Sequence, residues 1–148
     1  MKQRTFCMLK PDAVARRLIG RILKRFEAVG LKIVAMKLVK LSKETAEKNY
    51  SIHKGKPFYE PLIRYVTSGP VVCMVLEGED AVALVRKLVG ATKPLEAAAG
   101  TIRGDFGQRV DFNIIHASDA LETAQREIPV FFDLKEIVDY DLPDEKLI

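Results

Sequence analysis

Short apolar runs of strand length, alternating with helical periodicities, constrain the fold of this chain most strongly. The clearest run is Val71–Leu76, six apolar residues that follow a turn at Ser68–Pro70. A run this short, next to turn residues, indicates a buried strand. Residues 13–29 instead place apolar side chains three and four positions apart, as an amphipathic helix does. Gly30 follows them where a helix C-cap glycine belongs.

The same reasoning assigns the other segments. We predict strands at residues 4–10, 31–41, 71–77, 113–116 and 130–132. We predict helices at residues 13–29, 42–51, 58–66, 80–89 and 119–127. Residues 90–112 hold four glycines and little periodicity; a long loop of this kind in a compact domain usually has a function. The alternation of short strands with helices favours an α+β sandwich. We expect a ferredoxin-like, four-stranded antiparallel sheet with helices packed on one face.

The composition indicates one folded domain over residues 1–148. Apolar residues make up 48% and charged residues 30%, as is ordinary for globular proteins. Cys7 and Cys73 lie inside apolar runs, so we interpret them as small buried hydrophobes rather than disulfide or zinc ligands. The N-terminal residues lack a secretory pattern, and no apolar run approaches the ~20 residues of a membrane helix. We therefore expect a cytoplasmic protein without a membrane partner.

Charge is distributed unevenly along the chain. Residues 1–56 hold 15 Lys/Arg against 4 Asp/Glu, whereas residues 57–148 hold 9 against 16. A basic half suggests a polyanionic partner, such as nucleotide phosphates, nucleic acid or a membrane surface. It is also consistent with a solvated surface, or with pairing to the acidic half of a neighbouring subunit.

The common phosphate and metal motifs are absent. The chain has no G-x-x-x-x-G-K-[ST] loop, no dinucleotide fingerprint, no C-x-x-C and no H-E-x-x-H. A site that handles phosphate must therefore use side chains rather than a glycine cradle. His53 lies between charged and small residues and is interpreted as an ordinary surface histidine.

His116 stands out because it ends an apolar strand just before a predicted helix. Helix N-termini are anion sites, so both a structural or capping role and a catalytic role are open. Histidine suits phosphoryl transfer, because its ordinary pKa of ~6.5 leaves the neutral ring abundant at pH 7. A carboxylate on the second ring nitrogen would fix the tautomer, and Glu127 is a candidate. Arg86 and Arg103 could contact phosphate, although isolated arginines are more often solvated.

Six segments resemble the nucleoside diphosphate kinase family. In chain order they read RTFCMLKPDAV, KPFYEPL, TSGPVV, ATKP, GTIRGDFG and NIIHASDA. The last is similar to the family's active-site signature, Asn-x-x-His-[Gly/Ala]-Ser-Asp. The match runs in register from Arg4 to about Tyr140, nearly the whole chain.

The resemblance implies a ping-pong kinase. The terminal phosphate of ATP would move to His116 and then to a nucleoside diphosphate, which maintains NTP and dNTP pools. Lys10 would meet the terminal phosphate and the sugar, and Tyr50 would lie near the histidine. Ser118 and Glu127 would orient the ring.

For the nucleoside, the resemblance implies that Phe58 stacks on the base, with Val110 opposite it and Leu62 at the base edge. Asn113 would bond the ribose hydroxyl. Because every base has a π-face, stacking of this kind accepts many nucleosides.

For the phosphates, the resemblance implies Arg86, Thr92 and Arg103 as ligands. Mg²⁺ would enter with the nucleotide, so we expect no dedicated metal residue. The family also implies a homo-oligomer, and the tail beyond Phe132 favours a hexamer over a tetramer. Pro129 is unusual for the family but tolerable at the first residue of a strand.

Two other functions compete with this one. A ferredoxin-like sheet with a basic half could bind nucleic acid or a regulatory ligand without catalysis. RNA binding of that kind uses exposed aromatic residues on strands, and the strands at 4–10 and 71–77 offer only Phe6. We therefore do not expect a nucleic-acid partner. A family member that has lost activity is disfavoured because every matched catalytic position is occupied.

Overall fold

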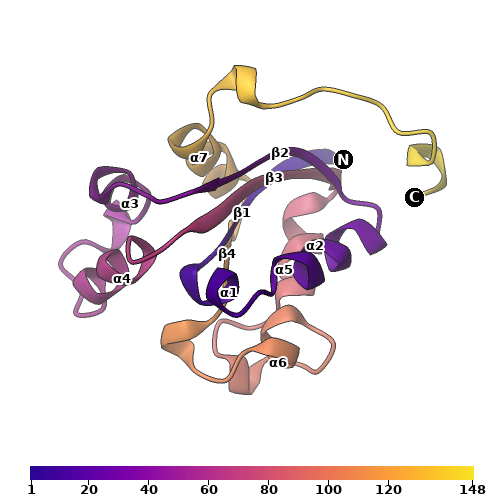
Figure 1. Ribbon diagram of the computed structural model, residues 1–148. Helices are drawn as coiled ribbons and strands as arrows, with labels where there is room; N and C mark the ends of the chain where they lie inside the picture. Colours follow the sequence, from indigo (N-terminus) through magenta and orange to yellow (C-terminus); the bar gives the residue numbers. More distant parts are fainter.

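The computed structural model describes residues 1–148 and contains one four-stranded antiparallel sheet with helices around it (Figure 1). The strands are β1 Lys2–Leu9, β2 Lys32–Val39, β3 Val71–Glu79 and β4 Ile115–Ala117. The helices are α1 Pro11–Ala15, α2 Ile19–Ala28, α3 Lys43–Asn49, α4 Tyr59–Val66, α5 Ala81–Val89, α6 Ile102–Phe106 and α7 Leu121–Phe131. Short 3₁₀ turns lie at Ser51–His53, Pro94–Glu96, Val110–Phe112, Leu134–Glu136 and Glu145–Leu147. No helix combines the length and the apolar character needed to cross a membrane.

The strand order β2-β3-β1-β4 confirms the expected ferredoxin-like sheet. β1 is central and pairs with β3 along its whole length, from Lys2 opposite Glu79 to Leu9 opposite Val72. On its other side β1 pairs with the short β4. The second half of β1 is covered on both faces, and its residues Phe6–Leu9 are therefore continuously apolar rather than alternating.

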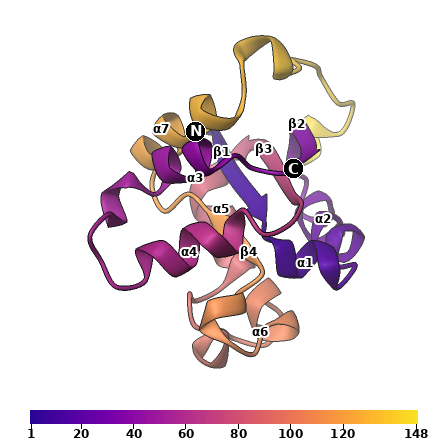
Figure 2. The ribbon, with the colours of Figure 1, turned by 60° about the vertical axis from the view of Figure 1, so that its left-hand side comes forward.

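Helices cover both faces of the sheet, so the expectation of helices on one face alone was wrong. Cys7 and Leu9 of β1 pack with α2 and α5, whereas Phe6 and Met8 pack with α3, α4 and α7. Figures 1 and 2 show these two groups of helices on opposite sides of the strands. The sheet thus lies between two separate apolar cores, one on each face. The expectation that both cysteines are buried is confirmed.

The predicted helix at 13–29 is two helices, with a break at Arg17. Arg17 has φ +59, its N–H donates to the Val14 carbonyl, and the Leu18 N–H donates to the Ala13 carbonyl. These two bonds form a Schellman motif, whose left-handed position glycine usually occupies. Gly30 fills the same position after α2, with φ +86. Because position 17 carries arginine, the apolar periodicity gave no sign of this stop.

The predicted last strand at 130–132 is also wrong, because α7 continues through Pro129 to Phe131. The Phe132 N–H still donates to the Ile128 carbonyl, which keeps the last turn helical beyond the proline. The Phe131 ring stacks on Phe6 of β1 at 4.4 Å between centroids. This contact with the central strand holds the segment as a helix on the sheet rather than as a fifth strand.

Residues 90–112 are folded rather than irregular. They form a lobe below the sheet in Figures 1 and 2, built from two 3₁₀ turns and α6. Thr101 caps α6 by accepting the Gly104 N–H at 3.0 Å. Gly104 is required here, because a Cβ at this position would lie 2.0 Å from the Ala98 carbonyl oxygen.

The basic and acidic halves of the sequence pair within the chain. Three such pairs are Arg4–Glu77 at 2.7 Å, Arg25–Asp105 at 2.6 Å and Lys37–Glu136 at 3.1 Å. The charge asymmetry of the sequence is therefore partly neutralised in space. No neighbouring subunit is needed for this pairing.

The C-terminal tail (yellow in Figure 1) folds back along β2 of its own chain. The Val138 N–H donates to the Val34 carbonyl at 2.8 Å. Further along, the buried Lys32 ammonium contacts the Tyr140 carbonyl and the Glu145 carboxylate. The tail thus covers part of the open edge of the sheet.

Replacing Arg17 with glycine should stabilise the protein. Glycine adopts φ +59 without the Cβ penalty, which is about 1–2 kcal/mol, although its flexibility in the unfolded chain offsets part of the gain. We expect the free energy of unfolding to rise by about 0.5–1 kcal/mol in urea titrations. Arg21→Gly, on the exposed face of α2, is the control and should lower it by about 1 kcal/mol. Equal losses in both variants would contradict the strain at Arg17.

Candidate active site

His116 lies in the middle of β4, opposite Met8 of β1, with its side chain 19% exposed. Its Nε2 lies 2.7 Å from Oε2 of Glu127. Tyr50 meets the imidazole edge-on at 5.7 Å, and Phe6 lies 5.9 Å away on the core side. The ring is therefore fixed on three sides and open on the fourth.

Glu127 is almost wholly buried and is held at both carboxylate oxygens. While Oε2 faces His116, Oε1 accepts the Ser118 hydroxyl at 2.6 Å. α7 supplies the carboxylate, and β4 with the residue after it supplies its two partners. No side chain caps the start of α7, so His116 has no capping role. Of the alternatives that the sequence left open, the geometry favours a ring prepared for chemistry.

A cavity of about 410 Å³ opens over His116. Its walls hold most of the predicted site residues: Lys10, Tyr50, Phe58, Leu62, Arg86, Thr92, Arg103, Asn113, His116 and Glu127. Ser118 lies fully buried behind Glu127. Val110 lines an adjoining hollow of about 650 Å³, which shares Phe58 and Leu62 with the first. The fold thus brings together side chains from distant parts of the chain.

Phe58 and Val110 are about half exposed across this second hollow. Phe58 precedes α4, whereas Val110 begins the 3₁₀ turn Val110–Phe112. Two apolar side chains on either side of a hollow can hold a flat aromatic group between them.

Four cationic side chains line the cavity, Lys10, Arg86, Arg103 and Arg126, and burial strongly lowers the pKa of two of them. Burial and the positive charge of Arg103, opposed by Asp12, together lower the pKa of Lys10 to about 8. Burial and repulsion from Arg86 together lower the pKa of Arg103 to about 10. Positive charges that burial and mutual repulsion make unfavourable are stabilised by an anion, so the cavity attracts negatively charged ligands.

Arg103 is anchored on backbone carbonyls rather than projecting freely. Its guanidinium donates to the carbonyls of Asn113 at 3.1 Å, Gly90 at 3.2 Å and Ile115 at 2.5 Å. Of the five N–H donors of an arginine, two remain for a ligand. Arg103 therefore also braces the segment that leads into β4.

That segment contains a γ-turn at Ile114. The Ile115 N–H donates to the Asn113 carbonyl at 2.8 Å, and Ile114 has φ +76. This hand of γ-turn is rare and strained, and a β-branched residue with positive φ is an outlier. Strain of this kind costs on the order of 1–3 kcal/mol and clusters at functional sites.

Sequence reasoning missed several residues that line the cavity. His53, interpreted as a surface histidine, is half-buried there, and its ring meets Phe58 edge-on at 5.2 Å. Burial, the nearby Lys56 and His116 lower the pKa of His53. Asn49 is buried, and both polar atoms of its side chain lack a hydrogen-bond partner. A charged or small-residue neighbourhood in the sequence does not reveal such placements.

The chain holds no cluster of three His, Cys, Asp or Glu side chains suited to a metal ion. Asp119 is the one exposed carboxylate in the cavity wall. A Mg²⁺ ion takes most of its ligands from phosphates and water, with one or two carboxylates. The residues present therefore fit a metal that arrives with a phosphorylated ligand.

Comparison of the sequence and the structure with known proteins identifies the family. Residues 3–137 match the family model described as nucleoside diphosphate kinase. The chain belongs to the nucleoside diphosphate kinase family. A curated relative of that name from Methanosphaera stadtmanae is 60% identical over 148 residues, which cover 100% of this chain and 97% of the relative. Another, from Saccharolobus solfataricus, is 58% identical over 91% of this chain and 98% of the relative.

Solved structures of nucleoside diphosphate kinases share the fold. The halophilic enzyme from Halobacterium salinarum, solved in complex with CDP, superposes with a TM-score of 0.97 at 46% identity, covering 99% of this chain and 98% of that one. The Borrelia burgdorferi enzyme, a transition-state mimic with bound vanadate and ADP, gives 0.92 at 40% identity, covering 97% and 95%. The expected family, fold and enzyme class are confirmed: the chain is a nucleotide-binding phosphotransferase.

The partly buried Lys10 should make stability depend on pH. Below pH about 8 the folded and the unfolded chain both hold the proton, so the unfavourable burial of charge is fully present. Between about 8 and the ordinary value of 10.5 only the unfolded chain holds it, so the free energy of unfolding rises with pH. Lys10→Met should be more stable than the parent protein near neutral pH, and this difference should shrink across that range in urea titrations. A difference that is constant with pH would contradict the lowered pKa.

Proposed function

We propose that this kinase works by a ping-pong mechanism in which His116 carries the phosphoryl group. One observation carries the proposal. Nε2 of His116 is paired with the buried Glu127 carboxylate, while the ring edge is open to a cavity lined by four cations. A nucleophile with its base partner already in place, facing a site for anions, is the arrangement that phosphoryl transfer requires.

The pairing with Glu127 assigns the tautomer. A carboxylate accepts a proton from the ring, so Nε2 carries the hydrogen and Nδ1 keeps its lone pair. Nδ1 attacks the terminal phosphorus of the triphosphate; the N–P bond forms as the bond from phosphorus to the bridging oxygen breaks, and the diphosphate leaves. A terminal phosphate oxygen of a second diphosphate then attacks the same phosphorus and releases Nδ1. Glu127 stabilises the positive ring during both steps.

The cations around the cavity supply charge to the transferred group. A loose phosphoryl transition state spreads negative charge over its outer oxygens, so positioning and neutralisation matter most. We assign Lys10, Arg86 and Arg103 to this role, with Thr92 as a further phosphate ligand. Mg²⁺ would add charge neutralisation when bound to the nucleotide phosphates, and Asp119 is the exposed carboxylate available to it in the cavity wall. The ADP and vanadate complex of the Borrelia relative supports this use of the pocket.

The adjoining hollow suits the nucleoside. The base would lie between Phe58 and Val110, with Leu62 at its edge, and Asn113 would bond the ribose hydroxyl. The Lys10 Nζ donates to the Asn113 side-chain oxygen at 2.9 Å, so the sugar and phosphate contacts are linked. Nothing in this sandwich reads the edge of a base by a dedicated hydrogen bond, which supports broad use of nucleosides, with ATP as the donor.

We propose a cellular setting that follows from this chemistry. Residues 1–148 would act as one kinase domain in the cytoplasm and maintain NTP and dNTP pools. Both cysteines are buried and unpaired, which fits a reducing compartment.

Brief incubation with γ-labelled ATP should leave label on the protein that is lost in acid and stable in alkali. His116→Ala should take up none, because His53, the other histidine in the cavity wall, has no carboxylate partner on its ring. The same variant should form no ADP when ATP and GDP are supplied together. Acid-stable label would instead assign the group to a hydroxyl such as that of Ser118, and the proposal would fail.

A homo-oligomer, hexameric rather than tetrameric, is our proposal for the assembly. Met36 and Leu38 on the edge strand β2 and Leu95 in the lobe at residues 90–112 are exposed apolar side chains, and such groups commonly mark interfaces. Light scattering should give about six times the chain mass of 16.6 kDa. A mass of four chains or of one chain would reject the hexamer.

A further inference from the structure

The γ-turn at Ile114 is held by groups that the mechanism above does not use. Only three residues other than glycine have positive φ, namely Arg17, Asp80 and Ile114, and only Ile114 is both β-branched and fully buried. A conformation this unfavourable persists only where surrounding contacts enforce it. Those contacts therefore determine the path of the chain just before the reacting histidine.

Two hydrogen bonds fix the peptide groups on either side of Ile114. Its carbonyl accepts the backbone N–H of Lys10 at 2.8 Å. Its own N–H donates to the Oδ2 atom of Asp12 at 3.1 Å. The second bond comes from a side chain and can be removed without touching the sheet.

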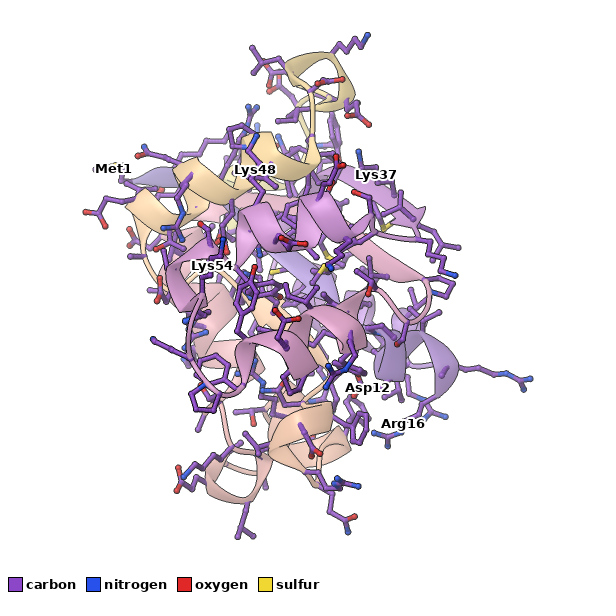
Figure 3. The ribbon with its side chains drawn as sticks, turned by 90° about the vertical axis from the view of Figure 1, so that its left-hand side faces the viewer. Met1, Asp12, Arg16, Lys37, Lys48 and Lys54 are labelled. Atoms are coloured by element: carbon purple, nitrogen blue, oxygen red, sulfur yellow. The ribbon has the colours of Figure 1, made fainter.

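Tyr65 in turn holds the Asp12 carboxylate. The Tyr65 hydroxyl donates to Oδ1 of Asp12 and accepts the Asp12 backbone N–H at 3.0 Å. Figure 3 labels Asp12, whose side chain lies between α1 and α4. Tyr65 also meets Phe112 edge-on at 5.2 Å between ring centroids, in the 3₁₀ turn that carries Val110. α4, which follows Phe58 and carries Leu62, is thus connected to the turn.

The turn orients the polar groups of the cavity. The Asn113 side chain accepts from Lys10 Nζ at 2.9 Å and donates to the Thr92 carbonyl at 3.1 Å. The carbonyls of Asn113 and Ile115, one on each side of the turn, both bind Arg103. If the turn relaxed, these groups would shift together, two residues before His116.

We propose that Asp12, locked by the Tyr65 hydroxyl, is a positioning residue for phosphoryl transfer. Its carboxylate keeps the Ile114 turn in the left-handed form that aims Asn113, Lys10 and Arg103 at the transferred group. Through Tyr65 it also ties the helix beside the base hollow to the phosphate end of the cavity. The inference rests on the proposed function, since it assigns Asp12 a part in that same transfer. Misplacement by about 1 Å can lower a rate by about 10²-fold, so a residue that touches no substrate can still govern turnover.

The test measures the single-turnover rate constant for loading His116 from γ-labelled ATP, because this constant does not depend on the fraction of active chains. Asp12→Asn removes the carboxylate's second good acceptor, and we expect loading to slow by about 10²-fold, with kcat falling and KM for GDP nearly unchanged. Tyr65→Phe keeps the ring against Phe112 and loses only the hydroxyl, and we expect about a tenfold loss.

Matched controls make the same chemical changes elsewhere. Tyr59→Phe alters a tyrosine on the same helix whose hydroxyl makes no hydrogen bond, and Asp133→Asn alters a carboxylate that caps a 3₁₀ turn remote from the cavity. Both should load at the parental rate, and their thermal midpoints show how much each change costs the fold.

The possible outcomes distinguish a failure of this inference from a failure of the proposed kinase function. If the parent protein takes no label and makes no GTP from ATP and GDP, the proposed function itself is wrong. If the parent is active and Asp12→Asn loads within about twofold of it, only the positioning role is overturned. Should Asp12→Asn fail to fold, Tyr65→Phe decides, and a rate equal to that of Tyr59→Phe overturns the role.

Discussion

The arrangement of the site depends on one strand that is buried on both faces. β1 pairs with β3 and β4 and contributes side chains to both apolar cores, so its position is fixed from four directions. Where it ends, the chain passes directly into Lys10 and α1. His116 lies on the strand beside it, opposite Met8. The central strand of the protein therefore sets the distance between His116 and Lys10, the two residues to which we assign the carrier role and the contact with the transferred phosphate.

The buried Glu127 carboxylate is the second constraint, and it is an electrostatic one. A buried charge is costly unless its oxygens are paired. Here His116 is paired with one oxygen of Glu127 and Ser118 with the other. If either side chain turned away, it would leave a buried oxygen without a partner, which is unfavourable. The stacking of Phe131 on Phe6 presses the same helix against the sheet. Packing and charge thus act together to hold one ring orientation.

Much of the fold and most of the site could be predicted from the sequence. The strand runs stand out because they are short and apolar, and the six segments that resemble the family, taken together, assign residues along nearly the whole chain. Helix ends were harder. The stop at Arg17 uses a motif that normally shows itself as glycine, and Pro129 ordinarily signals the end of a helix rather than its interior. Other features depend on contacts between distant segments: the link from Asp12 to Ile114 spans 102 positions, and only the fold brings the His53 ring beside Phe58.

The two cysteines have a consequence for how the molecule opens. They sit on paired strands, Cys7 opposite Met74 and Cys73 opposite Met8, and neither is accessible. Burial raises the pKa of both thiols, that of Cys73 to about 12, so almost no thiolate exists near neutral pH. Alkylating reagents and oxidants act on the thiolate, and they reach it only after the helices that cover each face of the sheet move away. Their rate of reaction therefore reports how often the helices open away from the two faces of the sheet.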